Sequence, residues 1–330
     1  MAAGETRTEP YFPLLDALRL VAVVGVVWLH VTYLGELKGW TELGRFAVPF
    51  FASVGVYLAF DSLRRHPDMS LPGYALVRFR RVYVVFLAWS VIYLGVRWVN
   101  ALMVSHIGTV KTSLVDFFWN GEAFQLWFLP FIFLATLGAF AVALLVRAVP
   151  WLRLPVAVIF LVLSVVIALL PMPSQHQLGY AALNSYESLP SCFAALGLVM
   201  ISSRDASGVR AWMLMAGAGM VLVWLVGATV LGHQQNVALT TVAGVGCLAA
   251  SLGWSTKERM PLISYLGSIA FGIYLVHLLF VESIQQVLPK LGFARDAADA
   301  EVFVFTLALA GSVALVALLR VSKWTRWLAG

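Results

Sequence analysis

The sequence is poor in charged residues and has almost no cysteine. Charged residues make up 12% of its 330 positions, hydrophobic residues make up 61%, and the mean hydropathy is +0.89. This composition excludes the class of soluble globular domains. The two cysteines, Cys192 and Cys247, both fall within apolar segments. We therefore expect small core residues at these positions, and neither a disulfide framework nor a zinc site.

Several motifs of soluble enzymes are also missing. There is no Gly-rich phosphate loop and no Gly-x-Ser-x-Gly elbow, so an acyl-serine intermediate is not supported. His106, His176 and His233 fall in separate loops without ligand spacing, and no metal is predicted. The first apolar segment is too long for a cleavable signal peptide, and we expect it to be retained.

The apolar segments predict an all-α polytopic membrane helix bundle. A helix needs about 20 apolar residues to cross the hydrocarbon core. By this criterion the chain forms a single integral-membrane domain, 1–330, with a short cytoplasmic tail at 1–11. The ten candidate spans are 12–34, 43–62, 82–104, 124–146, 154–171, 180–202, 211–231, 237–255, 262–282 and 302–321.

The sixth of these segments contains the polar run Asn184–Ser188. Either the span starts after this run, or its first half lines a polar cavity, where such residues are tolerated.

The distribution of Lys and Arg predicts the orientation. With the N-terminus inside, inner segments hold fifteen of the 22 basic residues, outer loops hold five, and two lie within spans. Basic residues accumulate on the cytoplasmic side, so both termini are expected in the cytoplasm and the chain in the cytoplasmic membrane, in contact with its lipids. Because the basic residues are spread over every inner loop, the pI of about 9.5 does not require a nucleic-acid partner.

The first span, 12–34, carries three ionisable residues: Asp16, Arg19 and His30. Arg19 and His30 are eleven residues apart, so on a helix they point in nearly the same direction, about 16 Å apart along the axis. Asp16 lies three residues before Arg19, within pairing distance. Arg19 as a snorkelling anchor and His30 as a hydrogen-bond partner of a neighbouring helix are the structural alternatives. A function is favoured because ionisable groups inside a membrane are costly.

The segment LLDALRLVAVVGVVWLH (14–30) resembles the first-helix signature of the acyltransferase-3 superfamily of integral-membrane O-acyltransferases, including surface-polysaccharide O-acetyltransferases. In that signature an arginine and a histidine are separated by ten residues, as Arg19 and His30 are. Further stretches resemble the family's motifs in order. The chain departs from these motifs at Ser53–Gly55, and it lacks the proline that usually follows the basic cluster, here at RRVYVVF (80–86). These stretches are VPFFASVGVYL (48–58), VRFRRVYVVFLAWSVIY (77–93), LWFLPFIF (126–133) and SIAFGIYLVHLLF (268–280).

The resemblance implies transfer of an acyl group, most commonly acetyl, from cytoplasmic acyl-CoA to a hydroxyl of a glycan, a lipid-linked acceptor or another cell-envelope acceptor. His30 would be the general base, a role suited to an unperturbed pKa of about 6.5. Arg19 would hold the donor. Arg78 and Arg81 share a face of an α-helix and would bind the phosphates of CoA. A basic cluster before a span is also what topology alone requires.

Four further residues are candidates for binding the acceptor. Tyr274 and His277, one helical turn apart, would bind it or orient His30, or else form structural inter-helix hydrogen bonds. Glu187 is a candidate cavity-lining residue. For Trp127 we favour a membrane-interface position over a sugar-stacking platform, since aromatic residues gather at interfaces.

Two alternatives to an acyltransferase fit ten membrane helices with polar residues at mid-depth. A transporter or exporter of a lipid-linked or glycan intermediate would have broken helices in symmetry-related halves, and the sequence has no convincing internal repeat. A helper subunit without chemistry of its own is the second alternative. The sequence predicts no oligomeric state for any of these classes.

Overall fold

The computed structural model describes residues 10–33, 35–103, 113–173, 178–202, 207–230 and 236–330. These residues form an all-α bundle without a β-strand, and an isolated bridge joins Tyr11 to Thr256. His106, His176 and His233 lie outside the described residues. The helices are α1 (Pro13–Thr32), η1 (Glu36–Gly44), α2 (Ala47–Arg65), α3 (Leu71–Arg78), η2 (Phe79–Tyr83), α4 (Val84–Met103), α5 (Leu114–Trp119), η4 (Phe124–Trp127), α6 (Phe128–Ala148), η5 (Pro150–Leu152), α7 (Arg153–Leu169), α9 (Tyr180–Ile201), α10 (Ser207–Val230), α11 (Val237–Gly253), α12 (Pro261–Val287), η6 (Leu288–Leu291), α13 (Ala298–Val321) and η7 (Arg326–Ala329).

A helix occupies each of the ten positions at which a span was expected. Within the described residues, eight helices are long and apolar enough to cross a membrane. The remaining two expected spans are α9, whose first half is polar, and α11, which has 17 residues. An integral-membrane protein is thus confirmed, whereas the orientation of its termini stays a prediction.

The third expected span is considerably longer than the sequence suggested. Its expected start at residue 82 is wrong, because a continuous helical segment of 32 residues begins at Leu71. The side chain of Ser70 caps it by accepting a hydrogen bond from the Gly73 amide at 3.3 Å, and Pro72 occupies the first turn. At 1.5 Å per residue this segment is about 48 Å long, which exceeds the roughly 30 Å hydrocarbon core. The helix therefore begins before the basic residues Arg78, Arg80 and Arg81 and continues through them.

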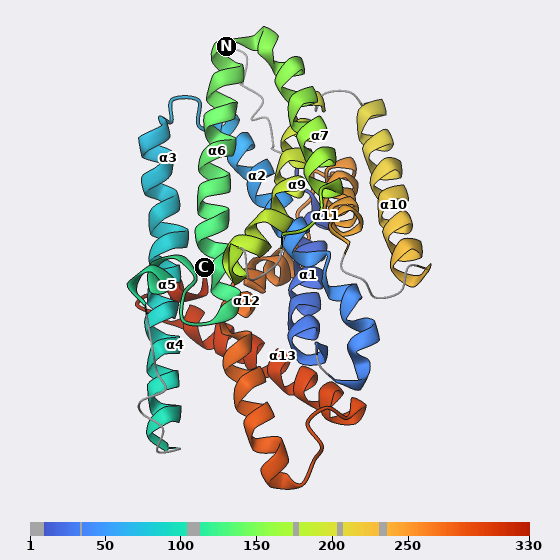
Figure 1. Ribbon diagram of the computed structural model, residues 1–330. Coiled ribbons are helices and arrows are strands. Elements are labelled where there is room, and N and C mark those ends of the chain that lie inside the picture. The colour runs from blue at the N-terminus through green and yellow to red at the C-terminus, as the bar shows by residue number, and fades with distance from the viewer. Residues whose placement is uncertain (1–9, 34, 104–112, 174–177, 203–206, 231–235) are drawn as a thin grey trace.

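Helix α1 lies inside the bundle and packs against α12, α2, α11 and α13 (Figure 1). The α1–α12 contact is close because Gly267 has no side chain: a Cβ there would lie 2.8 Å from the Asp16 Cα atom. Helices α10 and α11 also make close contact, since a Cβ on Gly217 would lie 2.5 Å from the Gly246 carbonyl oxygen. Such small residues allow membrane helices to approach each other.

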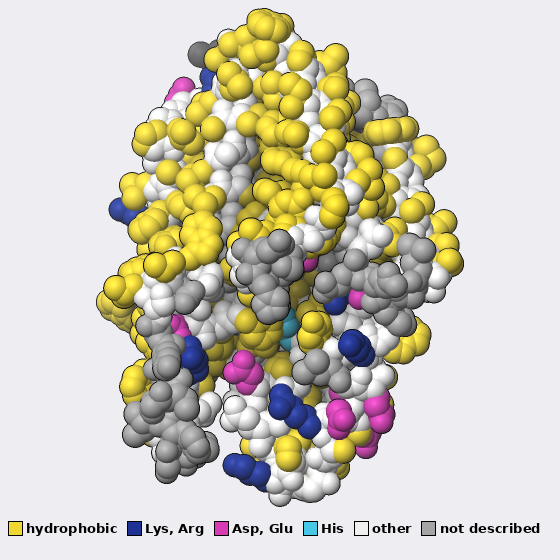
Figure 2. All heavy atoms as spheres, viewed as in Figure 1, with side chains coloured by type: hydrophobic (Ala, Val, Ile, Leu, Met, Phe, Trp, Pro, Cys, Tyr) yellow, Lys and Arg dark blue, Asp and Glu magenta, His cyan; other side chains and the backbone are white. Residues whose placement is uncertain are grey.

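The periphery of the bundle is apolar. Helices α7 and α10 have the smallest buried share among the candidate spans of the described chain. Figure 2 shows apolar side chains over the upper part of one face and charged side chains gathered at its lower end. The cysteines Cys192 and Cys247 are buried, as expected of core residues.

The predicted orientation can be tested with two exposed lysines in connections at opposite ends of the bundle. Lys257 lies between α11 and α12, and Lys290 lies between α12 and α13. A membrane-impermeant maleimide should label Lys290→Cys in right-side-out vesicles and Lys257→Cys only in inverted vesicles, because lysines of inner loops face the cytoplasm. The buried native cysteines should give little background. The reverse labelling pattern would contradict an N-terminus on the inside.

Candidate active site

A cavity of about 900 Å³ opens at the end of the bundle that the charge distribution predicts to face outward. Its walls come from the second half of α1, the starts of α2, α6, α9 and α11, and the second half of α12. Figure 2 shows histidine atoms within a hollow on the face of the molecule that it draws. The first half of α9 lines the cavity with Asn184, Glu187 and Ser188, so of the two alternatives for the sixth segment the cavity-lining one is correct.

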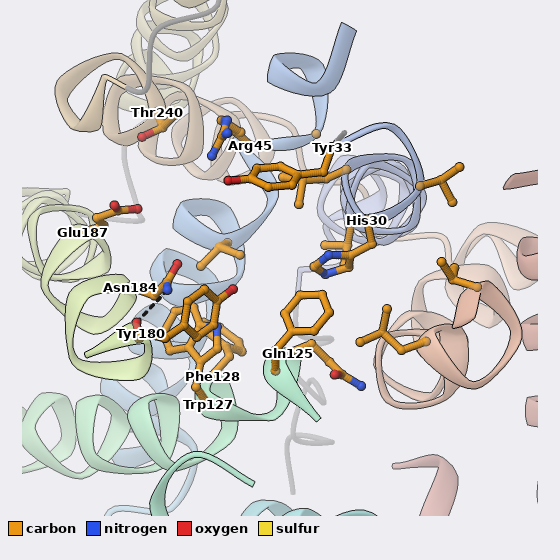
Figure 3. A pocket seen from close by; sticks show the side chains of 18 of the residues that line it. His30, Tyr33, Arg45, Gln125, Trp127, Phe128, Tyr180, Asn184, Glu187 and Thr240 are labelled. Atoms are coloured by element: carbon orange, nitrogen blue, oxygen red, sulfur yellow. Dashed lines mark hydrogen bonds between the residues drawn. The ribbon is translucent and has the colours of Figure 1, made fainter. Parts of the chain in front are cut away.

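His30 lines this cavity from the last turn of α1 (Figure 3). The ring of Phe124 meets the imidazole edge-on, with centroids 4.6 Å apart, and the ring of His277 stacks on it at 5.1 Å and 17°. Among the described residues, neither ring nitrogen of His30 has a hydrogen-bond partner. The imidazole is therefore fixed by packing, while its nitrogens remain available to a molecule in the cavity.

His277 supports His30 from α12 and does not itself line the cavity. It is fully buried, and its Nδ1 lies 2.7 Å from the Tyr274 carbonyl oxygen. Because a carbonyl oxygen only accepts, Nδ1 carries the proton, and the Nε2 of the neutral ring is an acceptor. That Nε2 atom is buried without a hydrogen-bond partner among the described residues. The position of His277 fits the hypothesis that it orients His30 better than direct contact with an acceptor.

Tyr274 ties α12 to the segment that carries Phe124. Its buried hydroxyl donates a hydrogen bond to the Gln125 backbone carbonyl. The Gln125 side-chain amide in turn donates to the Tyr93 hydroxyl at 3.0 Å, and Tyr93 donates to the Leu275 carbonyl at 2.8 Å. Tyr274 also lines the cavity. The network thus holds η4 against α12 beside His30.

The wall opposite His30 is polar (Figure 3). Glu187 and Asn184 project from α9, Thr240 from α11 and Arg45 from the connection between η1 and α2. Arg45 forms an ion pair with Glu42 at 2.7 Å, and its charge also acts on Glu187. Sequence reasoning missed Arg45 and Thr240, because nothing in their local sequence distinguishes them from ordinary loop and helix-end residues. Asn184 belongs to the polar run for which a cavity-lining position was one of the two alternatives.

The remaining lining combines aromatic rings with carboxylates and amides. Four acidic residues and two arginines line the cavity: Glu187, Glu282, Asp296 and Glu301, and Arg45 and Arg295. The aromatic residues are Tyr33, Phe124, Trp127, Phe128, Tyr180 and Tyr274. Carboxylates and amides bind hydroxyl groups, and aromatic rings cover apolar faces. This arrangement suits a polyhydroxylated molecule.

Trp127 requires a correction. The favoured membrane-interface position is wrong, because the side chain is only 6% exposed and lines the cavity. It packs against Phe128 and Phe131 at ring-centroid distances of 5.7 and 5.9 Å. Trp127 ends η4 and points inward because this segment packs inside the bundle. A local hydropathy pattern does not predict such packing.

Arg19 and His30 are not brought into one cavity. Arg19 forms the expected ion pair with Asp16 at 3.5 Å, and neither residue lines the cavity of His30. Arg19 is separated from His30 by about 16 Å along the helix.

Arg78 and Arg81 lie at a π-helical segment, η2, and outside the cavity of His30. The i→i+5 hydrogen bonds of this segment change the register expected of an α-helix, and π-helical segments are frequent at functional sites. Arg78 is partly buried and Arg81 exposed, so the two do not project alike, although the charge of Arg81 acts on Arg78. The Nε atom of Arg78 is buried without a partner among the described residues, and this donor fits an anionic ligand.

The chain matches the model of a family described as an acyltransferase domain over residues 12–321. This match covers nearly the whole sequence, so the chain belongs to the acyltransferase-3 family and is a membrane acyltransferase. Neither a curated protein nor a solved structure matches it significantly.

The packing of His277 on His30 predicts different effects of two substitutions. His277→Phe keeps a ring against His30, whereas His277→Ala removes it. The turnover number should therefore fall by about 10²-fold in His277→Ala, the effect of a small misplacement at an active site, and much less in His277→Phe. The KM of the acceptor should stay unchanged in both variants.

Purified variants would be checked for folding by size exclusion, with His66→Ala as the control, because His66 is exposed at the far end of α2. If His277→Phe were as inactive as His277→Ala, the ring nitrogens of His277 would take part in the chemistry.

Proposed function

We propose that this protein is an O-acyltransferase that moves an acyl group, most simply acetyl, from cytoplasmic acyl-CoA to a hydroxyl of a cell-envelope glycan or related acceptor. The observation that carries the proposal is the imidazole of His30 in the wall of a 900 Å³ cavity with aromatic, carboxylate and amide lining, in a member of an acyltransferase family. A cavity of this size accommodates one or two sugar units, in the range typical of small-molecule sites.

His30 acts as the general base in this proposal. The acceptor hydroxyl enters the cavity, and its oxygen attacks the carbonyl carbon of the thioester while the imidazole takes its proton. The C–S bond breaks, the ester forms, and the CoA thiolate leaves and receives a proton, so the products are the acylated acceptor and free CoA. The Phe124 and His277 rings hold the imidazole in place during this step.

The donor binds from the opposite end of α1. The guanidinium groups of Arg78 and Arg81 bind the phosphates of CoA, as supported by the buried, unpartnered Nε of Arg78. Arg19 lies on the same stripe of α1 as His30 and guides the thioester arm, with Asp16 offsetting part of its charge. The acceptor is bound by Glu187, Trp127 and Tyr274, all of which line the cavity.

Removal of the general base tests this proposal. In vesicles supplied with radiolabelled acetyl-CoA, transfer of label to the glycan fraction should fall by about 10²–10⁴-fold in His30→Ala, because the general base is lost. Binding of CoA should be retained, and His66→Ala should transfer label as the wild type does. Equal transfer by the wild type and His30→Ala would show that His30 is structural. A chain that neither binds nor turns over acyl-CoA would point to transport instead.

The donor site makes a separate prediction. Arg78→Gln should raise the KM for acyl-CoA by about tenfold or more, since a hydrogen bond to a charged group is lost. The turnover number should change little, because the interaction is made equally in the ground and transition states. Arg80→Gln is the matched control from the same segment, with an exposed side chain. A similar rise of KM in Arg80→Gln would indicate a general effect of surface charge.

A further inference from the structure

Glu301 is a buried carboxylate in the wall of the cavity that also contains His30. Its side chain is 2% exposed and lies in the first turn of α13. One carboxylate oxygen, Oε2, accepts a hydrogen bond from the Leu37 amide at 2.8 Å. The other oxygen, Oε1, is buried without a hydrogen-bond partner among the described residues. A glutamate is almost never fully buried unless it is paired, so this oxygen calls for an explanation.

The start of α13 is fixed against η1 and α1 (Figure 1). The Glu36 amide donates a hydrogen bond to the Asp296 carbonyl at 2.9 Å. One turn after the buried carboxylate, the ring of Phe305 packs edge-on against Trp28 of α1, with centroids 5.2 Å apart. Trp28 lies two residues before His30. The carboxylate is therefore held at the end of α1 that carries the imidazole.

Gly35 leaves the space that the carboxylate occupies. A Cβ on this residue would lie 2.3 Å from Oε1 of Glu301 and 2.4 Å from its carboxyl carbon. Gly35 also lines the cavity. Its φ of −97° is accessible to all residues, so the backbone conformation does not require a glycine here. What the missing side chain provides is room for the carboxylate beside the cavity.

The surroundings of Glu301 lack a counter-ion. The charged side chains that act on it are both acidic, Glu36 and Asp296. Within the described chain no lysine or arginine forms an ion pair with it. Arg295, the cation nearest in sequence, donates to the Gln285 side chain at 2.8 Å. The hydrogen bond to Oε2 and the positive end of the α13 dipole offset only part of a carboxylate charge.

A buried carboxylate is stabilised by a cation that donates hydrogen bonds to it. An ammonium group supplies both the positive charge and the donors. The cavity, at about 900 Å³, has room for such a group in addition to a sugar ring at His30. We infer that the acceptor carries a cationic amino group, as an amino sugar does, and that Oε1 of Glu301 binds this group. The inference rests on the proposed function, because it takes the molecule in the cavity to be the acceptor.

Ligand-observed NMR on the purified full-length protein, without acyl-CoA, tests the inference. The probe is glucosamine, whose ammonium group replaces one hydroxyl of glucose, and glucose is the uncharged counterpart. The wild type should bind glucosamine at least about tenfold more tightly than glucose, since a hydrogen bond between charged groups is gained. This preference should disappear in Glu301→Gln. Asp299→Asn, which removes an exposed carboxylate from the same turn of α13 and outside the cavity, should retain it.

A second variant guards against a general effect of Glu301→Gln on folding. Gly35→Ala keeps the charge of Glu301 and forces the carboxylate to move, because the added Cβ would otherwise lie 2.3 Å from Oε1. It should reduce the preference for glucosamine while the protein stays monodisperse on size exclusion. An equal preference in the wild type, Glu301→Gln and Gly35→Ala would overturn the inference.

The comparison with glucose separates an ammonium from a hydroxyl as the bound group. A wild type that binds glucosamine no better than glucose would overturn the inference, and weakening of both sugars in Glu301→Gln would then identify Glu301 as a site for a hydroxyl group. Because acyl-CoA is absent, these outcomes do not depend on acyl transfer. A protein that prefers glucosamine but transfers no label from acetyl-CoA would contradict the proposed function and leave the ammonium site in place.

Discussion

The close contact between α1 and α12 is the constraint on which the rest of the site depends. At one end of this contact the absence of a side chain on Gly267 lets the backbone of α12 approach Asp16, the partner of Arg19. At the other end the His277 ring stacks on His30. Through Tyr274, α12 also holds the Gln125 backbone and thereby the neighbouring Phe124 ring. The α1–α12 pair therefore fixes the positions of both Arg19 and His30, which lie on the same side of α1.

Polar residues in a membrane bundle are tolerated where their hydrogen bonds are satisfied or where they face a cavity. Helix α9 uses both solutions. Ser185 and Ser188 donate back to the carbonyls of Ala181 and Asn184 at 2.7 and 2.8 Å, which satisfies their hydroxyl groups within the helix. Glu187 and Asn184 line the cavity. The same polar half that keeps α9 out of the set of apolar spans thus supplies the wall opposite His30.

The sequence allowed prediction of what depends on composition and on spacing along a single helix. The ten helix positions, the Asp16–Arg19 pair and the two alternatives for α9, a later start or a cavity-lining first half, all follow from such local features. The inward position of Trp127, the π-helical register at Arg81 and the contribution of Arg45 do not, because each depends on how separate elements meet. A tryptophan at the end of a span has the same local pattern whether it faces lipid or a cavity, and only the fold distinguishes the two.

Under the proposed function, the two substrates need not share one entrance. Arg78 and Arg81 lie outside the cavity of His30, and Arg19 is separated from His30 by about 16 Å along α1. The phosphates of CoA can remain at one end of the bundle while only the acyl-bearing arm extends toward His30. The acceptor can then occupy the aromatic and acidic cavity from the other end. In such an arrangement the protein does not need to alternate between inward-open and outward-open states. Only the acyl group has to pass from one end of the bundle to the other, whereas each substrate stays at its own end. The chemistry of a membrane acyltransferase is in this respect compatible with a bundle whose central helix pair stays fixed.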